Sequence, residues 1–343
     1  MLNKVWQTHL QEQGATFDND SVVHFDNRKK ELQITTSGNV LCDLSHLGLL
    51  EISGADAVSF LQGQVTNDVK LLTGSNAHYT AYCNPKGRLL ALFLAFTHAD
   101  HLHLQLPKSL VEPIAKRLRM YVLRSKVEIK DVSNEIVKFG INGPEAASIL
   151  ASSLGDLPSE DFDLLSLENC TVMRLPTISD HSRFEIFASA ENAIALWNLL
   201  NKQCQPAGKA CWDWLDIQVG IPEIYPSTQE QFVPQMLNLD ALNAINYKKG
   251  CYTGQEIVAR THYLGTVKRR TFLAHITCQH EPAAGDKLLD LQGNECGQIV
   301  RVAAGLDKGF DVLAELRLEA QANMQIVWNN HPLAFKALPY KLE

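Results

Sequence analysis

The chain changes its pattern of apolar residues near residue 268, and this change limits the folds open to it. Between residues 40 and 219, segments that alternate like β-strands are interleaved with segments of helical spacing. From Arg270 onward the pattern becomes short strands separated by turns that contain glycine. The sequence therefore predicts an α+β region followed by a small all-β domain at the C-terminal end.

Strands and helices are expected at definite positions within the α+β region. Strands are predicted at residues 40–44, 48–52, 79–83, 89–96, 101–106, 127–132, 136–141, 171–175 and 183–187. Helices are predicted at residues 55–62, 107–123, 144–154, 190–203 and 210–219, with a short amphipathic helix at residues 1–14. A turn of sequence Asn-Pro-Lys-Gly at residues 84–87 joins two of these strands into a predicted β-hairpin.

Composition narrows the class of protein. A chain of 343 residues, 45% hydrophobic and 20% charged, is expected to form two or three packed domains. The net charge of -7 argues against a generally basic nucleic-acid binder. Eight cysteines without a C-x-x-C pair predict reduced thiols in a cytoplasmic protein. The longest apolar run, residues 89–96, is too short to span a bilayer, so no membrane partner is expected.

The segment from residue 248 to 270 places one cysteine before the expected start of a helix. Thr253 and Glu256 have the T-x-x-E form of a capping box, which predicts a helix from about residue 254 to 265 with residues 257 and 258 directed inward. The positive end of that helix and the neighbouring Lys249 would favour the thiolate of Cys251. The alternative is that Cys251 is a small buried hydrophobic residue beside turn glycines.

The same segment is locally basic. Between residues 246 and 270, six Lys or Arg residues stand against the single acid Glu256, a balance of 6 - 1 = +5 within an acidic chain. The six are Lys248, Lys249, Arg260, Lys268, Arg269 and Arg270. Such a patch predicts a site for an anionic ligand, a polyglutamate tail or an RNA backbone, and the alternative is a solvated helix face.

The run Lys-Gly-Cys-Tyr-Thr-Gly-Gln-Glu at residues 249–256 resembles the signature of the YgfZ family of folate-binding proteins, which is related to the glycine-cleavage T-protein, an aminomethyltransferase. The resemblance continues through residues 232–239 and 258–260, and through residues 43–69 and 82–88. It covers about residues 40 to 340. It implies a ring of two ferredoxin-like α+β lobes and a C-terminal β-barrel, with folate in the central cavity.

The resemblance also implies domain boundaries. Residues 1–48 and 133–245 would form a discontinuous first α+β lobe that binds folate, and residues 49–132 would form the second lobe. Residues 246–268 would carry the cysteine signature, and residues 269–343 would form the barrel.

The function that the resemblance implies is support of the assembly, maintenance or repair of iron-sulfur enzymes, and thereby of tRNA modification. The expected ligand is tetrahydrofolate or a one-carbon derivative, and the expected partners are an iron-sulfur enzyme or assembly protein and tRNA. Two alternatives stay open: a folate-dependent one-carbon transferase acting on protein or RNA, and a non-catalytic adaptor that docks tRNA or a modifying enzyme. Whether the chain is an enzyme is therefore left open.

Site residues follow from the resemblance, position by position. Cys251 would be the reactive thiol, with Lys249 lowering its pKa. The expected folate-site residues are Gln218, Asn67, Asp68, Gly250, Tyr252, Gly254, Gln255, Glu256 and Arg260. Asn67 and Asp68 could instead form only a turn with capping side chains.

Two positions depart from the T-protein pattern. Residues 87–92 read Gly-Arg-Leu-Leu-Ala-Leu, so the aspartate of the aminomethyltransferases is replaced by an apolar residue that cannot exchange a proton. Gln218 stands where many relatives have glutamate, and an amide offers a pterin one acceptor oxygen instead of two. Ordinary glycine-cleavage activity is therefore not expected.

Three histidines lie close together in sequence and are a candidate metal site. His98, His101 and His103 form H-x-x-H-x-H, but no cysteine or carboxylate cluster accompanies them at ligand spacing. A solvated histidine face is the favoured interpretation, and no metal is expected.

Overall fold

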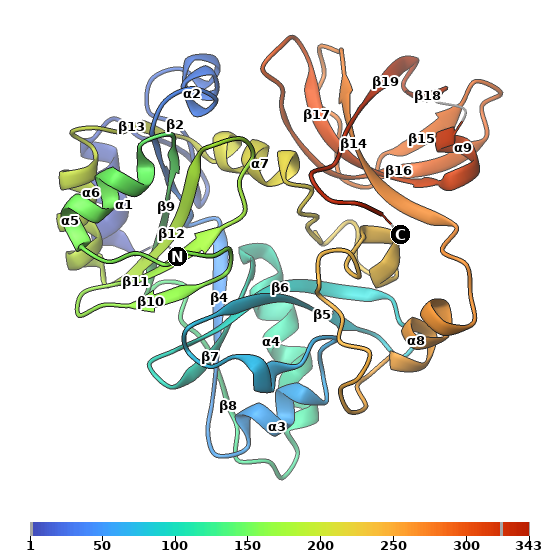
Figure 1. Ribbon diagram of the computed structural model, residues 1–343, viewed down its shortest axis with the longest axis horizontal. Coiled ribbons are helices and arrows are strands. Elements are labelled where there is room, and N and C mark those ends of the chain that lie inside the picture. The colour runs from blue at the N-terminus through green and yellow to red at the C-terminus, as the bar shows by residue number, and fades with distance from the viewer. Residues whose placement is uncertain (1–2, 323–324, 343) are drawn as a thin grey trace. The chain divides into compact units, whose positions relative to one another are not determined.

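A computed structural model describes residues 3–322 and 325–342. The chain divides into two compact units that are interleaved in sequence (Figure 1). Unit 1 comprises residues Met1–Ala57, Leu72–His78 and Leu94–Leu215, and unit 2 comprises Val58–Leu71, Tyr79–Phe93 and Asp216–Glu343. The boundaries predicted for the separate lobes stay a prediction.

Unit 1 contains a six-stranded sheet of order β10-β11-β12-β9-β3-β13. Its strands are β3 (Val40–Asp43), β9 (Val137–Gly143), β10 (Leu164–Ser166), β11 (Thr171–Leu175), β12 (Ser182–Ala188) and β13 (Gln205–Ala207). The neighbours pair antiparallel except for β13, which runs parallel to β3. The short hairpin β1 (Thr16–Asp18) and β2 (Ser21–His24) stands apart from this sheet and leads to α2 (Arg28–Thr35).

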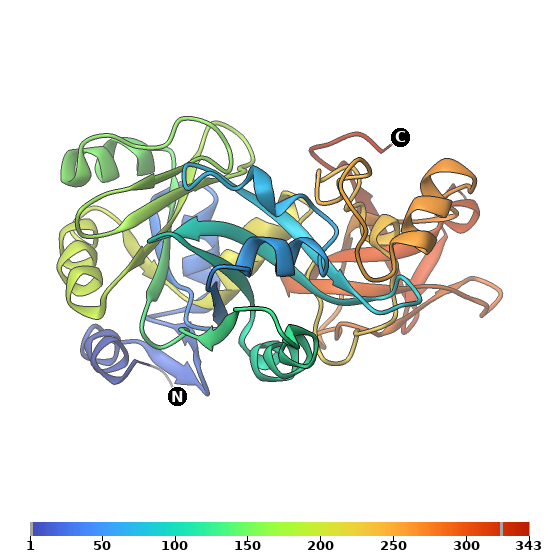
Figure 2. The ribbon, with the colours of Figure 1, turned by 90° about the horizontal axis from the view of Figure 1, so that it is seen from below.

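Helices cover both faces of this sheet, and its central strands β9 and β12 are buried on both sides. Three helices, α1 (Lys4–Glu12), α5 (Ala146–Leu154) and α6 (Ala190–Leu200), pack together on one face (Figure 1, Figure 2). The core there contains Trp6 and Trp197, whose rings meet edge to face at 5.3 Å. On the opposite face, Trp212 of α7 (Lys209–Gln218) lies against Gly140, where an added Cβ would come within 2.1 Å of the indole.

A five-stranded sheet has the order β5-β6-β7-β4-β8. Its strands are β4 (Leu47–Ser53), β5 (Ala77–Cys83), β6 (Leu89–His98), β7 (His101–Pro107) and β8 (Glu128–Asp131). Strands β5 and β6 each pass from one unit into the other. In unit 1, α4 (Lys108–Val122) packs on β4, β7 and β8 through an apolar stripe that includes Leu110, Ile114 and Leu118.

A closed six-stranded barrel occupies the C-terminal part of unit 2 and has the order β14-β17-β16-β15-β18-β19. Its strands are β14 (Arg269–Ile276), β15 (Lys287–Asp290), β16 (Glu295–Ala304), β17 (Phe310–Arg317), β18 (Ile326–Trp328) and β19 (His331–Lys336). The short helix α9 (Leu318–Ala322) follows β17. Closure leaves no free sheet edge, and inward residues such as Ile299, Val312 and Leu316 fill the interior.

The remaining short elements of unit 2 lie close to the signature sequence. They are η1 (Val69–Leu71), η2 (Pro234–Leu237) and α8 (Gln255–Tyr263), and α3 (Ala57–Gln62) enters unit 2 at residue 58. In the part of the chain that the structure describes, every helix is too short or too polar to cross a bilayer.

The predicted fold class is confirmed: an α+β region precedes a barrel whose first strand begins at residue 269. The predicted helix at residues 190–203 is shorter than expected and ends at Leu200, where Asn201 forms the C-cap. The hairpin at residues 16–24, helix α2 and strand β13 had no counterpart in the prediction.

Candidate functional site

The loop that carries Cys251, residues 248–254, is here called the signature loop, and it packs against the turn at residues 84–87. Gly254 has φ of +84°, and a Cβ on it would lie 2.5 Å from the carbonyl oxygen of Asn84. A Cβ on Gly87 would lie 2.9 Å from Cβ of Ile257. Both glycines are therefore required by close approach, and the two segments that carry the family resemblance form one assembly inside unit 2.

The turn itself is held by one side chain. Asn84 Oδ1 accepts hydrogen bonds from the backbone N–H of Lys86 at 2.9 Å and of Arg88 at 3.0 Å. Arg88 then donates from Nη1 to the carbonyl oxygen of Gln231 at 2.6 Å. This network gives the signature loop a rigid surface to lie on.

Helix α8 starts differently from the prediction. Its N-cap is Gly254, and no side chain caps it, so the predicted capping box of Thr253 and Glu256 is wrong. Instead, Gln255 Oε1 accepts from the backbone N–H of Tyr252 at 3.3 Å. Val258 is buried as expected, whereas Ile257, which was expected to point inward, is 37% exposed.

Exposure separates Cys251 from the other cysteines. All eight thiols are unpaired, and Cys251 is exposed while the other seven are buried. Burial raises the pKa of those seven, to about 12 for Cys83, Cys204 and Cys211. The interpretation of Cys251 as a small buried hydrophobic residue is therefore wrong.

Lys249 is buried and bonds to the main chain of a distant segment. Its Nζ donates to the carbonyl oxygens of Gln62 at 2.7 Å, Asn67 at 2.9 Å and Val65. Burial lowers the pKa of Lys249 to about 8, partly opposed by the charge of Asp68. Nζ also lies 5.1 Å from the centre of the Tyr252 ring, which is itself buried. Lys249 thus anchors the signature loop, and its predicted effect on the Cys251 thiol stays a prediction.

Asn67 and Asp68 form the turn that the sequence allowed for. Asn67 Nδ2 donates to the carbonyl oxygens of Tyr79 at 3.0 Å and Asn243 at 2.8 Å. Asp68 Oδ1 accepts from the backbone N–H of Lys70 at 3.1 Å and so caps the short helix η1. These bonds account for both side chains structurally, and their predicted role toward folate stays a prediction.

Gln218 ends α7 and contacts the barrel. Its Nε2 donates to Oδ2 of Asp311 at 2.9 Å, and Asp311 is buried. Oδ1 of Asp311 accepts from Lys336 Nζ at 2.7 Å and lies 2.8 Å from His275 Nδ1. The amide of Gln218 is therefore oriented by a charged acceptor, and its predicted role toward the pterin stays a prediction.

The basic run is less cationic than its sequence suggests. Lys249 is turned into the protein, Arg269 forms a two-point ion pair with Glu315, and Arg270 pairs with Asp240. Exposed cations of the run are Lys248, Arg260 and Lys268. The balance of +5 is therefore not all presented to solvent, because Asp240 and Glu315 pair with two of the cations. The predicted binding of an anionic ligand or RNA by this run stays a prediction.

The other predicted site residues lie in the signature loop and in α8. Gly250 has open space where a Cβ would be, and Glu256 and Arg260 are exposed. Where the T-protein pattern has its acidic residue, β6 carries Leu90 and Ala91, which are buried. No proton-transferring group is available at that position.

The histidines of β6 and β7 are not a solvated face. His103 is buried, stacks on Phe96 at 5.4 Å, and burial lowers its pKa to about 4. His101 Nδ1 and His103 Nε2 lie 3.2 Å and 3.7 Å from the same oxygen of Glu51. Among the described residues, no three His, Cys, Asp or Glu side chains are grouped as metal ligands would be.

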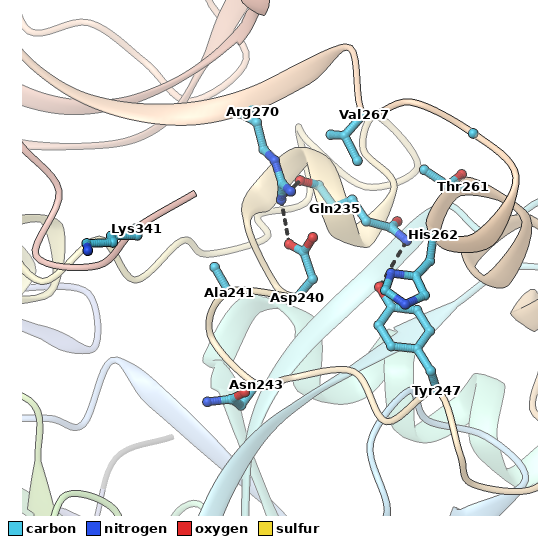
Figure 3. A pocket seen from close by; sticks show the side chains of 11 residues that line it. Gln235, Asp240, Ala241, Asn243, Tyr247, Thr261, His262, Val267, Arg270 and Lys341 are labelled. Carbon is cyan, nitrogen blue, oxygen red and sulfur yellow. Dashed lines mark hydrogen bonds and ion pairs between the residues drawn. The ribbon is translucent and has the colours of Figure 1, made fainter. Parts of the chain in front are cut away.

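A cavity of about 460 Å³ opens within unit 2 beside α8 (Figure 3). It is lined by Gln235, Asp240, Ala241, Asn243, Tyr247, Thr261, His262, Gly265, Val267, Arg270 and Lys341. Among these residues, the sequence analysis gave a binding role only to Arg270, as part of the basic run. Tyr247, His262 and Tyr263 lie among the cations of the basic run, and this mixture of rings and positive charges could have indicated the cavity from the sequence.

Comparison with known proteins agrees with the resemblance to the YgfZ family and to the glycine-cleavage T-protein. Residues 6–247 match the GCVT N-terminal domain. The chain is 33% identical over 248 residues to the tRNA-modifying protein YgfZ of Yersinia pestis, covering 72% of this chain and 74% of the relative. The chain belongs to the YgfZ family.

A second relative supports this assignment, and one solved structure shares the fold. The tRNA-modifying protein YgfZ of Hamiltonella defensa is 35% identical over 246 residues, 71% of this chain and 72% of its own length. The glycine cleavage system aminomethyltransferase T of Bartonella henselae superposes with a TM-score of 0.77 at 18% identity, covering 97% of this chain and 96% of that protein. The latter likeness establishes the shared fold.

Proposed function

We propose that this chain binds tetrahydrofolate or a one-carbon derivative and supports the assembly, maintenance or repair of iron-sulfur enzymes, and thereby tRNA modification, with Cys251 as its reactive thiol. The observation that carries the proposal is the exposed Cys251 on a loop anchored at three points. Gly254 meets the Asn84 turn, Lys249 bonds to three carbonyl oxygens, and Tyr252 is buried. A thiol held on a rigid support and open to solvent suits reaction with a partner.

The chemistry open to such a thiol includes nucleophilic attack, redox exchange and transient contact with a cluster. Each of these reactions uses the thiolate of Cys251. None requires an acidic residue at positions 90 and 91, where this chain has Leu90 and Ala91. The curated relatives are named as tRNA-modifying proteins, which supports tRNA modification as the process served.

The test is the content of modified nucleosides in tRNA, measured by mass spectrometry in cells whose own copy of the gene is replaced. Cys251→Ala is expected to reduce nucleosides made by iron-sulfur enzymes to about a tenth. Cys204→Ala is the matched control, because that thiol is buried. Unchanged nucleoside content in the Cys251→Ala cells would remove the thiol from the function.

Folate binding is tested separately by calorimetric titration with tetrahydrofolate under anaerobic, reducing conditions. We expect saturable one-to-one binding. Gln218→Met keeps the length of the side chain but removes the amide oxygen that can accept a hydrogen bond from a pterin N–H. The affinity for tetrahydrofolate should therefore fall about tenfold, which is the effect of losing one hydrogen bond between neutral groups in a buried site. Gln292→Met, in an exposed turn, is the control. Absence of binding by the native protein would exclude folate.

A further inference from the structure

The cavity beside α8 has an aromatic wall. The rings of Tyr247 and His262 stack with their centres 3.8 Å apart and their planes within 10°. Tyr263 meets both rings edge on, at 6.1 Å and 4.7 Å. His262 and Tyr263 are exposed, so this aromatic group is accessible from solvent. Figure 3 shows the stacked rings of Tyr247 and His262. Flat aromatic surfaces of this kind bind planar heterocycles by stacking.

One polar atom of the cavity lacks a partner. Gln235 is 1% exposed, and its Nε2 donates to the carbonyl oxygen of Val258 at 2.8 Å and to Oη of Tyr247 at 3.3 Å. Its Oε1 is buried and has no hydrogen-bond donor within reach. Because a buried acceptor without a donor is costly, a ligand N–H that reaches Oε1 would be favoured. Figure 3 shows this amide beside the Tyr247–His262 pair.

Charged groups line the same cavity. Asp240 and Arg270 form an ion pair in which Oδ1 of Asp240 accepts from Nη1 of Arg270. Lys341, which is exposed, contributes a cation to the lining. The cavity therefore combines the stacking surface with two acceptors for ligand N–H groups, Gln235 Oε1 and the Asp240 carboxylate. It also has Lys341 as a cation for a phosphate.

We propose that this cavity binds one unpaired nucleotide of an RNA strand, with the base on the Tyr247–His262 pair and the phosphate near Lys341. The inference rests on the proposed function, since the strand would belong to the tRNA that is served. Proteins recognise unstacked RNA bases by aromatic stacking and by hydrogen bonds to the base edge. Because Gln235 Oε1 and the Asp240 carboxylate are acceptors, a base with an exocyclic amino group fits better than uracil.

The experiment titrates the full chain with guanosine, cytidine, adenosine and uridine 5′-monophosphates and follows binding by NMR chemical shifts. The three nucleotides with an amino group are expected to bind about tenfold more tightly than uridine monophosphate. His262→Ala should weaken their binding about tenfold through loss of stacking, and His262→Phe should retain it. His280→Ala, an exposed histidine away from the cavity lining, is the matched control.

Each outcome decides the proposal. Equal affinity for all four nucleotides, or no effect of His262→Ala, would overturn it. Tetrahydrofolate that displaces guanosine monophosphate in a His262-dependent manner would also overturn it and make the cavity a pterin site. The nucleoside content of tRNA with Cys251→Ala is measured independently, so failure of the proposed function is distinguishable from failure of the nucleotide site.

Discussion

Iodoacetamide at pH 8 is expected to modify Cys251 of the folded protein at least about 100-fold faster than any of the other seven cysteines. Alkylation proceeds through the thiolate and needs access to the sulfur. The seven other thiols are buried, and burial raises the pKa of Cys83, Cys204 and Cys211 to about 12. At pH 8 a thiol with a pKa near 12 is ionised in only about one molecule in ten thousand. The buried thiols also react only when the structure opens.

The measurement is peptide mass spectrometry over a time course of labelling, with peptides resolved for each cysteine. The Cys251→Ala protein should take up almost no label in the folded state, and both proteins should be fully labelled in 6 M urea, a denaturing condition in which all thiols are exposed. Labelling of Cys278 or Cys296 in the barrel at a rate like that of Cys251 would contradict the burial of those side chains. It would also weaken the assignment of Cys251 as the distinct reactive centre.

Local patterns predicted most of the fold because local physics decides it. A continuous apolar run identified β6, alternating apolar residues identified β7, and helical spacing of Leu110, Ile114 and Leu118 identified α4. The elements that were missed lack such patterns. Helix α2 is largely polar, with the sequence Arg-Lys-Lys-Glu-Leu-Gln-Ile-Thr, and it is held instead by Glu31, whose carboxylate accepts from the backbone N–H of Phe25, Asp26 and Gly208.

The site could be predicted only where chemistry resides in one stretch of sequence. The signature at residues 249–256 pointed to Cys251, and its exposure agrees with a reactive role. Contacts between residues far apart in the sequence could not be predicted. Gln218 meets Asp311 and Arg270 meets Asp240, and no spacing rule connects these pairs. The cavity combines η2, the loop after it and α8, so its aromatic wall becomes visible only once these segments are folded together.

Replacement of Lys249 by methionine is expected to lower the free energy of unfolding by about 3 kcal/mol at pH 7. The substitution keeps the apolar stem but removes three bonds from Nζ to the carbonyl oxygens of Gln62, Val65 and Asn67. Bonds from a charged donor contribute about 1.5–3 kcal/mol each, and this gain is partly offset by the cost of burying the ammonium group. The neighbouring Lys248→Met is the matched control, because Lys248 is exposed and its loss should change stability by less than about 0.5 kcal/mol.

The pH dependence of this difference has a definite sign. Burial lowers the pKa of Lys249 in the folded state to about 8, below its ordinary value of 10.5 in the unfolded chain. Between these two values the unfolded chain binds more protons, so the stability of the native protein gains from Lys249 as the pH rises. Lys249→Met lacks this gain, and the difference in unfolding free energy should therefore grow between pH 8 and pH 10. Urea unfolding at pH 7, 8, 9 and 10 measures it. A difference below about 1 kcal/mol at pH 7 would show that the signature loop is not anchored through Lys249. A difference that shrinks as the pH rises would contradict the lowered pKa of its buried ammonium group.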